Sequence, residues 1–279
     1  MKRIVSCIVV LAMLTGCGGS GDIEETPTVE PVTKPIPVYN QAYIENYDVA
    51  DTIDEIITNA RDAYVMVDPF DDNVDQNVDT IKSLNNQVAG YISAGTGEDW
   101  REDFSALEPY LVTKAWPEWP GEYFVNETTT GILDVMKLRI DKMTDWGLDW
   151  VEFDNMDWLD EETRNEYDLQ ATVAEAKAYI NDLCDYTHAK GLKCMAKNTV
   201  DSFENFDGVL YESYNDDKNW WNVEGTKSFL AAGKLVIINH YNETDCDGVY
   251  AEYQKYYNSE NISFICEDIG LQRYKHYNE

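Results

Sequence analysis

Short apolar runs alternate with longer amphipathic stretches along most of the chain. The runs are rich in β-branched and aromatic residues, as buried strands are. They cover residues 38–43, 63–68, 88–93, 150–154, 193–197, 208–212, 235–240 and 263–267. The stretches with helical spacing of apolar residues cover 48–61, 75–85, 132–146, 171–190 and 246–258. Alternation of strand and helix predicts a parallel sheet covered by helices.

The number and spacing of these runs favour one closed barrel over an open sheet. Roughly 240 residues carry them, close to the size of a (β/α)8 barrel. Gly147 and Gly191 follow two helical stretches, where glycine commonly ends a helix. Two other assignments of the strands remain open: residues 110–115 or 123–126 form a strand as well, or residues 38–43 lead into the barrel without being its first strand. With either assignment, residues 150–154 are the fourth strand. We therefore predict a single (β/α)8 TIM-type barrel over residues 37–279.

The N-terminus has the pattern of a bacterial lipoprotein signal. Lys2 and Arg3 precede an apolar stretch over 4–14, which ends at the sequence LTGC. We expect residues 1–16 to be a signal peptide and Cys17 to carry the lipid; the alternative is a secretory signal cut elsewhere. Gly18 after the cysteine favours the outer membrane or cell surface. Residues 17–36 are rich in Gly, Thr, Pro and Glu and predict a flexible linker after the lipidated cysteine.

Composition excludes several classes of partner. Asp and Glu number 53 against 21 Lys and Arg, a formal charge of −32, so nucleic acid and anionic membrane surfaces are disfavoured and we expect membrane contact through the lipid only. The chain has 19 Tyr and 8 Trp, enough to place some on a sugar-binding surface. After export, Cys184, Cys194, Cys246 and Cys266 remain, and the sequence does not choose among their three disulfide pairings.

Polar side chains gather at the ends of the predicted strands, where an α/β barrel builds its active site. They are Asp68, Glu152, Asp154, Lys197, Asn198, Glu212 and His240. Alternation along the fourth strand directs Glu152 and Asp154 to the same, inner face. Because a buried carboxylate needs a partner, Lys197 or water at the barrel mouth is expected beside them.

Two of these acids suit glycoside cleavage. That reaction uses one carboxylate as nucleophile or base and one carboxylic acid to protonate the departing oxygen, on opposite sides of the scissile bond. Strands four and six are not adjacent in a closed barrel, so Asp154 and Glu212 would face each other across the mouth. Lys197 would lower the pKa of Asp154, whereas burial against Tyr211, Tyr214 or a tryptophan would keep Glu212 protonated.

Five segments resemble glycoside hydrolase family 114, the endo-α-1,4-polygalactosaminidase group. They are YISAGTGEDWR from Tyr91, WPGE ending at Glu122, GLDWVEFDNMD from Gly147, HAKGLKCMAKN from His188 and DGVLYE ending at Glu212. The resemblance implies a (β/α)8 barrel, export, and retaining hydrolysis of α-1,4-linked galactosamine-containing polysaccharide. It also implies that Asp154 is the nucleophile and Glu212 the acid/base.

The chain departs from the family's pattern in two places. Phe153 stands where the family usually has proline, and Ser213-Tyr214 where it usually has Gln-Cys. We expect both departures beside the sugar subsite, where they leave the acids intact and the substrate open.

Further residues are candidates for binding sugar. The predicted substrate-binding set is Asp68, Tyr91, Glu98, Trp116, Glu152, Asn155, Lys197, Asn198 and Tyr214. Other tryptophans that follow predicted strands either stack on sugars or pack in loops; they are Trp119, Trp158, Trp220 and Trp221. Acids at the mouth would suit the ammonium groups of a partly deacetylated amino sugar, although solubility in salt also explains an acidic chain.

Other chemistries lack support in the sequence. His188, His240 and His276 share no metal-ligand spacing, residues 68–75 lack the Gly and Glu of an EF-hand loop, and no GxSxG or GxGxxG motif follows a strand. We therefore predict no metal and no cofactor, with a polysaccharide as the partner. Two alternatives remain: a noncatalytic carbohydrate-binding lipoprotein on the same barrel, and a glycosidase for a different glycan.

Overall fold

The computed structural model describes residues 35–42, 52–214, 224–257, 262–268 and 274–278. The expected signal peptide, Cys17 and nearly all of the linker lie outside the described residues. No helix within the described ranges combines the length and the apolar composition needed to cross a bilayer.

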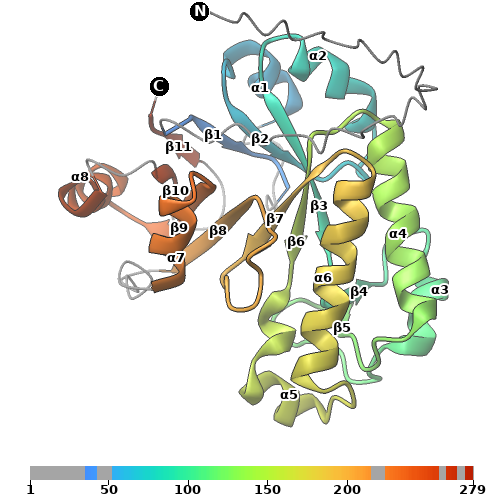
Figure 1. Ribbon diagram of the computed structural model, residues 1–279. Helices are drawn as coiled ribbons and strands as arrows, with labels where there is room; N and C mark the ends of the chain where they lie inside the picture. The colour runs from blue at the N-terminus through green and yellow to red at the C-terminus, as the bar shows by residue number, and fades with distance from the viewer. Residues whose placement is uncertain (1–34, 43–51, 215–223, 258–261, 269–273, 279) are drawn as a thin grey trace, which may run out of the picture.

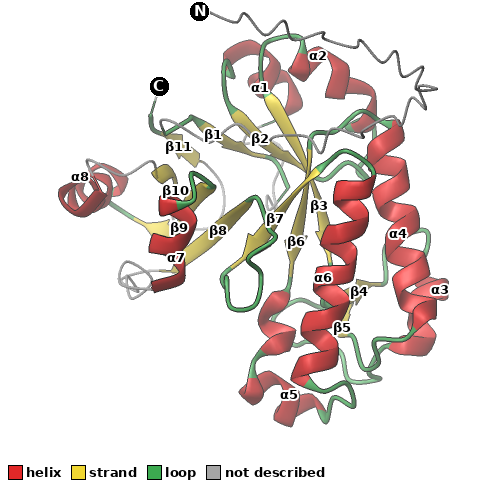
Figure 2. Ribbon diagram, viewed as in Figure 1, coloured by secondary structure: helices red, strands yellow, loops and turns green. Residues whose placement is uncertain are grey.

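Parallel strands form a nearly closed barrel, as Figures 1 and 2 show. In spatial order they are β1 (Val38–Asn40), β2 (Tyr64–Val67), β3 (Gln87–Ser93), β6 (Trp150–Asp154), β7 (Lys193–Lys197), β8 (Gly208–Tyr214), β9 (Leu235–Glu243) and β10 (Ile262–Asp268). A short strand, β11 (Tyr274–His276), pairs antiparallel with β10, and His276 Nδ1 lies 2.7 Å from the carbonyl oxygen of Val38 in β1. All the predicted strand runs are confirmed, and the predicted TIM-type barrel is correct.

Helices follow most of the strands and cover the outside of the barrel. They are α1 (Ile53–Asn59), α2 (Val78–Lys82) after a 3-10 turn (Asp75–Asn77), α4 (Thr130–Asp145), α6 (Val173–Ala189), α7 (Glu224–Ala231) and α8 (Cys246–Tyr257). Thr172 and Glu175 form a capping box at the start of α6. Gly147 and Gly191 have φ of +81° and +83°, left-handed values that end α4 and α6 as predicted.

An insertion after β3 builds a small second sheet. Strand β4 (Thr96–Glu98) pairs antiparallel with β5 (Glu122–Phe124), and between them lie α3 (Phe104–Leu107) and a 3-10 turn (Glu108–Tyr110). Another 3-10 turn (Met156–Leu159) and α5 (Glu161–Tyr167) follow β6. Figure 1 shows β4, β5 and α5 gathered at the end of the barrel where β3 and β6 finish. We call this end the mouth.

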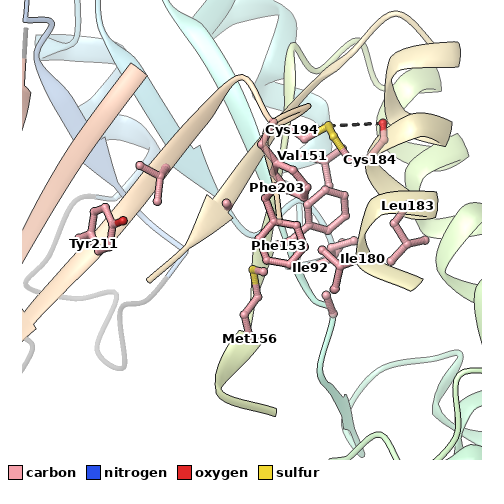
Figure 3. Packing of buried hydrophobic residues seen from close by; sticks show 14 of the residues in the cluster. Ile92, Val151, Phe153, Met156, Ile180, Leu183, Cys184, Cys194, Phe203 and Tyr211 are labelled. Carbon is pink, nitrogen blue, oxygen red and sulfur yellow. Dashed lines mark hydrogen bonds between the residues drawn. A yellow bond between two sulfur atoms is a disulfide. The ribbon is translucent and has the colours of Figure 1, made fainter. Parts of the chain in front are cut away.

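Two layers of buried side chains follow the alternation of the strands. Trp150, Met195 and Leu210 fill the inside of the barrel, while their neighbours Val151 and Cys194 pack outward against the helices. Figure 3 shows part of this outer layer beside α6. The alternation of side chains along the strands therefore separates the interior of the barrel from the core between the strands and the helices. Only side chains that point into the barrel line its mouth.

Two disulfides connect helices to neighbouring strands. Cys184 of α6 is bonded to Cys194 of β7, and Cys246 of α8 to Cys266 of β10. This pairing settles the three possibilities that the sequence left open. The first disulfide connects α6 covalently to β7, the strand that ends in Lys197.

Candidate active site

Lys197 stands at the centre of the mouth with three carboxylates around it. Its Nζ lies 2.6 Å from Asp154 Oδ1, 3.1 Å from Glu212 Oε1 and 3.7 Å from Glu152 Oε1. The side chain of Lys197 is 1% exposed, and so is that of Glu152. Neighbouring strands β6, β7 and β8 thus bring together four of the charged residues that the sequence selected. Glu152 lies one layer below Asp154, inside the barrel.

Burial and charge act in opposite directions on this group. Burial is the largest effect at Asp154 and raises its pKa; Lys197 lowers it, as predicted, but Glu212 raises it, and the net change is upward. Burial also works against the charge of Lys197, yet the three carboxylates raise its pKa above the usual range. Lys197 therefore keeps its proton, and its ammonium group forms a buried ion pair with Asp154.

Glu212 is held from the side by the residue that follows Lys197. Asn198 Nδ2 donates to Glu212 Oε2 at 3.0 Å, and Asn198 Oδ1 accepts from the Glu212 backbone N–H at 2.8 Å. The side chain of Glu212 is 33% exposed, against 15% for Asp154. The two acids thus differ in environment, with Glu212 the more open to water.

Tyr211 does not bury Glu212, contrary to our expectation. It lies on the opposite face of β8 and packs in the helix-facing core. Phe153 likewise faces outward, 5.7 Å from the ring of Phe206, so its departure from the family pattern lies away from the sugar subsite (Figure 3). His240 also faces the helices, with Nδ1 3.2 Å from the hydroxyl of Tyr253. The side chain of Tyr214 lies outside the described residues, as do Trp220 and Trp221.

Asp68 and Glu98 bind arginines. Arg101 donates to Asp68 at 2.5 and 3.0 Å and to Glu98 at 2.8 and 2.9 Å, and Arg139 lies 3.5 Å from Glu98. Burial raises the pKa of Asp68 to about 6, although Arg101 opposes this. We expected these carboxylates to bind sugar; the structure instead uses them to link β2, β4 and α4 through buried ion pairs.

The aromatic candidates divide between the mouth and the packing around it. Tyr91 of β3 is buried, and its ring lies 5.8 Å from the guanidinium of Arg101. Trp116 is partly buried and packs on Phe124 with 4.8 Å between the ring centres. Trp158 is fully buried with Nε1 donating to the Val125 carbonyl, so the packing alternative holds for Trp158. Trp119 is 41% exposed.

Several buried polar residues near the mouth were missed by the sequence analysis. Glu122 of β5 accepts hydrogen bonds from Thr96 and Asn155 at 2.5 and 2.9 Å. The hydroxyl of Tyr274 in β11 accepts from Asn40 Nδ2 at 3.0 Å. The only signal for Glu122 was its place in the WPGE segment. Tyr274 reaches the barrel interior because β11 closes the gap beside β1, which the strand pattern does not predict.

One group of side chains within the described ranges has metal-ligand chemistry. It comprises Cys184, His188 and Cys194, with ligand atoms within 4.8 Å of one another. The two sulfurs are bonded to each other, and His188 Nε2 lies 2.8 Å from Asp207 Oδ2. This geometry is that of a disulfide beside a histidine–aspartate pair, on the outer face of β7.

Comparison with known proteins places the fold among glycoside hydrolases. Ega3 of Aspergillus fumigatus, solved in complex with galactosamine, is 20% identical, with a TM-score of 0.68 over 92% of this chain and 100% of that one. The glycoside hydrolase domain of PelA from Pseudomonas aeruginosa is 14% identical, with a TM-score of 0.60 over 87% and 97%. None of the curated proteins matches the chain significantly.

The family assignment comes from the sequence itself. The profile of glycoside-hydrolase family GH114 matches residues 39–279, which includes all of the barrel except Val38 and every residue of the candidate site described above. This chain belongs to glycoside-hydrolase family GH114.

Proposed function

We propose that this glycoside hydrolase cleaves α-1,4-linked galactosamine-containing polysaccharide with retention, using Asp154 as nucleophile and Glu212 as acid/base. The observation that carries the proposal is the contact of one ammonium group with both acids. Since Lys197 Nζ lies 2.6 Å from Asp154 and 3.1 Å from Glu212, the contacting oxygens are at most about 6 Å apart. Retaining enzymes place their carboxyl groups about 5–5.5 Å apart and inverting enzymes about 6.5–9.5 Å.

The contacts of the two acids support the two roles, whereas the burial that we expected at Glu212 is found at Asp154. Asp154 is the anion of a buried ion pair and is ready to attack the anomeric carbon. Glu212 is more exposed and is aimed by Asn198, so it can give its proton to the departing glycosidic oxygen and then take one from the water that releases the sugar. Lys197 offsets the negative charge of the neighbouring acids, and its bond to Asp154 weakens as the covalent intermediate forms.

The substrate class is supported by the resemblance and by charge. Ega3, whose fold this chain shares, was solved with galactosamine. Around the mouth, the carboxyl groups of Glu152, Asp154 and Glu212 outnumber the one ammonium group of Lys197. An excess of carboxylates attracts the ammonium groups of a deacetylated amino sugar.

The test is an assay of new reducing ends on partly deacetylated galactosaminogalactan. Asp154→Asn and Glu212→Gln should each lower turnover by at least about 1,000-fold, because each removes a group that reacts. Asp182→Asn, an exposed change on α6, is the matched control. A folded Asp154→Asn or Glu212→Gln protein with wild-type turnover would overturn the site. Activity only on another polysaccharide would keep the site and change the substrate.

Retention is tested separately with a smaller nucleophile. Azide should restore turnover to Asp154→Gly and yield a glycosyl azide of inverted configuration, because azide then enters from the face that Asp154 occupied. Product of retained configuration from this variant would contradict the nucleophile assignment.

We also propose that the enzyme is exported and held in the cell envelope, at the outer membrane or cell surface, by lipid on Cys17. The sequence LTGC after an apolar stretch supports this. Labelling with radioactive palmitate in an expressing bacterium should mark the wild type and leave Cys17→Ser unlabelled. Equal labelling of both proteins would refute the anchor.

A further inference from the structure

Glu122 lies in the wall of the active site, on the small β4–β5 sheet. Its residue is 5% exposed, and its Oε2 accepts hydrogen bonds from Thr96 Oγ1 at 2.5 Å and from Asn155 Nδ2 at 2.9 Å. The amide of Asn155 also donates to Ser93 Oγ at 2.8 Å and contacts Thr96 Oγ1 at 3.2 Å. Side chains from β3, β4 and β5 thus fix the Asn155 side chain in one position.

The position of this side chain determines the backbone next to Asp154. Asn155 has φ of +58°, a left-handed conformation that is uncommon for residues other than glycine and that asparagine adopts more readily than most. Asn155 is bonded directly to Asp154, whose backbone carbonyl accepts from the N–H of Ala94 at 3.0 Å. Hydrogen bonds therefore join Glu122 to Asn155, the residue that directly follows the proposed nucleophile in the chain.

We propose that Glu122 is a positioning residue: it acts through Asn155 to hold the Asp154 carboxylate in its reactive orientation. The inference rests on the proposed function, because it takes Asp154 as the nucleophile. Glu122 itself touches no reacting atom in this proposal. Its removal should therefore lower kcat more than it changes KM, since the sugar contacts remain and the orientation of the attacking oxygen is lost.

The protonation of Glu122 agrees with a purely positional role. Burial raises its pKa to about 8; Glu98 and Asp154 raise it too, while Thr96 and Arg101 oppose the change. At neutral pH the carboxyl is therefore mostly neutral and adds no further charge beside Asp154. Glutamine has the same shape and the same neutrality, so its side-chain oxygen can accept the same two hydrogen bonds.

The test is a double-mutant cycle on kcat with partly deacetylated galactosaminogalactan. Glu122→Ala should lower kcat by about 30- to 100-fold with KM within about threefold, and Glu122→Gln should recover most of that loss. Asn155→Ala should cause a similar loss. Adding Glu122→Ala to Asn155→Ala should change kcat by less than about twofold, because the two residues act through one route.

Controls separate positioning from simple destabilisation. Asn86→Ala removes a buried amide that makes three hydrogen bonds beneath β2 and β3, so it should lower thermal stability and leave kcat unchanged below its melting temperature. Should Glu122→Ala fail to fold, Glu122→Met, which fills more of the space and accepts no strong hydrogen bond, enters the same cycle with Asn155→Ala.

The outcomes distinguish this inference from the proposed function. Additive losses in the double variant, or a Glu122→Gln enzyme as impaired as Glu122→Ala, would overturn the role of Glu122 even if Asp154→Asn and Glu212→Gln are inactive. Full activity of Asp154→Asn would instead refute the proposed function, whatever the Glu122 variants do.

Discussion

Lys197 is the cation around which the inner face of the barrel is arranged at the mouth. Burying an ammonium group costs several kcal/mol unless partners offset it, and here three carboxylates from the two neighbouring strands β6 and β8 surround it. The same contacts make Lys197 necessary to the acids, because without it Asp154 and Glu152 would be buried close together with no cation between them. Stability and chemistry therefore depend on the same side chain.

Lys197→Met tests this dependence, since methionine fills similar space without the charge. We expect the free energy of unfolding to fall by about 3–5 kcal/mol at neutral pH, because one partner of a buried ion pair is removed. The loss of unfolding free energy should be smaller at acidic pH, where the carboxylates left without a cation take up protons. Urea denaturation at pH 5 and pH 8 measures both effects, with the exposed Lys227→Met of α7 as control. An equal loss of unfolding free energy at the two pH values would contradict this explanation.

Glu122 adds its own pH dependence to folding. Its pKa is about 8 in the folded protein against an ordinary value of 4.5, so the folded state binds the proton more tightly than the unfolded state does. The stabilising contribution is complete below about 4.5, declines as the pH rises and is lost once the pH passes about 8. Wild type should therefore lose more melting temperature between pH 5 and pH 9 than Glu122→Gln. Parallel melting curves for the two proteins would show that Glu122 does not titrate in this range.

At the scale of elements, β6 and β7 end in the same way. Each strand finishes with a charged inward residue, Asp154 or Lys197, followed by an asparagine in the left-handed conformation, with φ of +58° at both Asn155 and Asn198. Each asparagine then turns its amide toward a carboxyl of a neighbouring element. The strand ends therefore do more than present the acids, because the turn that follows each strand orients them.

This arrangement requires glycine at position 95, between β3 and β4. A Cβ built there would lie 1.9 Å from the carbonyl oxygen of Asn155. Gly95→Ala should therefore displace Asn155 and lower kcat by at least about 10-fold, with a smaller loss of stability. Gly191→Ala is the control, because its Cβ meets no atom within 4 Å and its effect should be on stability alone. Wild-type kcat in Gly95→Ala would show that the Asn155 turn is not needed.

The strand pattern predicted which residues face the mouth, and its failures were of two kinds. The alternation that directs Glu152 and Asp154 inward also directs Phe153 outward, so the expectation that Phe153 borders the sugar conflicted with a signal already present. Tyr211 was misplaced for the same reason, because the alternation that directs Glu212 inward directs Tyr211 outward. The ion pairs of Asp68 and Glu98 with Arg101 are different, because they join the β4 insertion to β2 and no local pattern predicts how an insertion folds back.

The whole molecule carries a large negative charge that the active site does not explain. The formal charge is −32, and part of it lies on exposed residues away from the mouth, such as Asp145 at the end of α4 and Asp185 near the end of α6. Repulsion among such charges opposes the compact state, and dissolved salt screens it over a Debye length of about 10 Å at 0.1 M. The buried ion pairs of Lys197 and Arg101 are screened far less.

Salt should therefore act in opposite directions on folding and on substrate capture. Raising NaCl from about 20 to 500 mM should increase the melting temperature, because repulsion between surface carboxylates falls. The same change should lower kcat/KM for partly deacetylated galactosaminogalactan, whose ammonium groups are drawn to the acidic chain. A fully N-acetylated sample of the polymer is the matched control, and its kcat/KM, if measurable, should respond little to salt. If salt lowered kcat/KM equally for both polymers, attraction of ammonium groups would play no part in substrate choice, and recognition would depend on the shape and hydrogen bonds of the mouth alone.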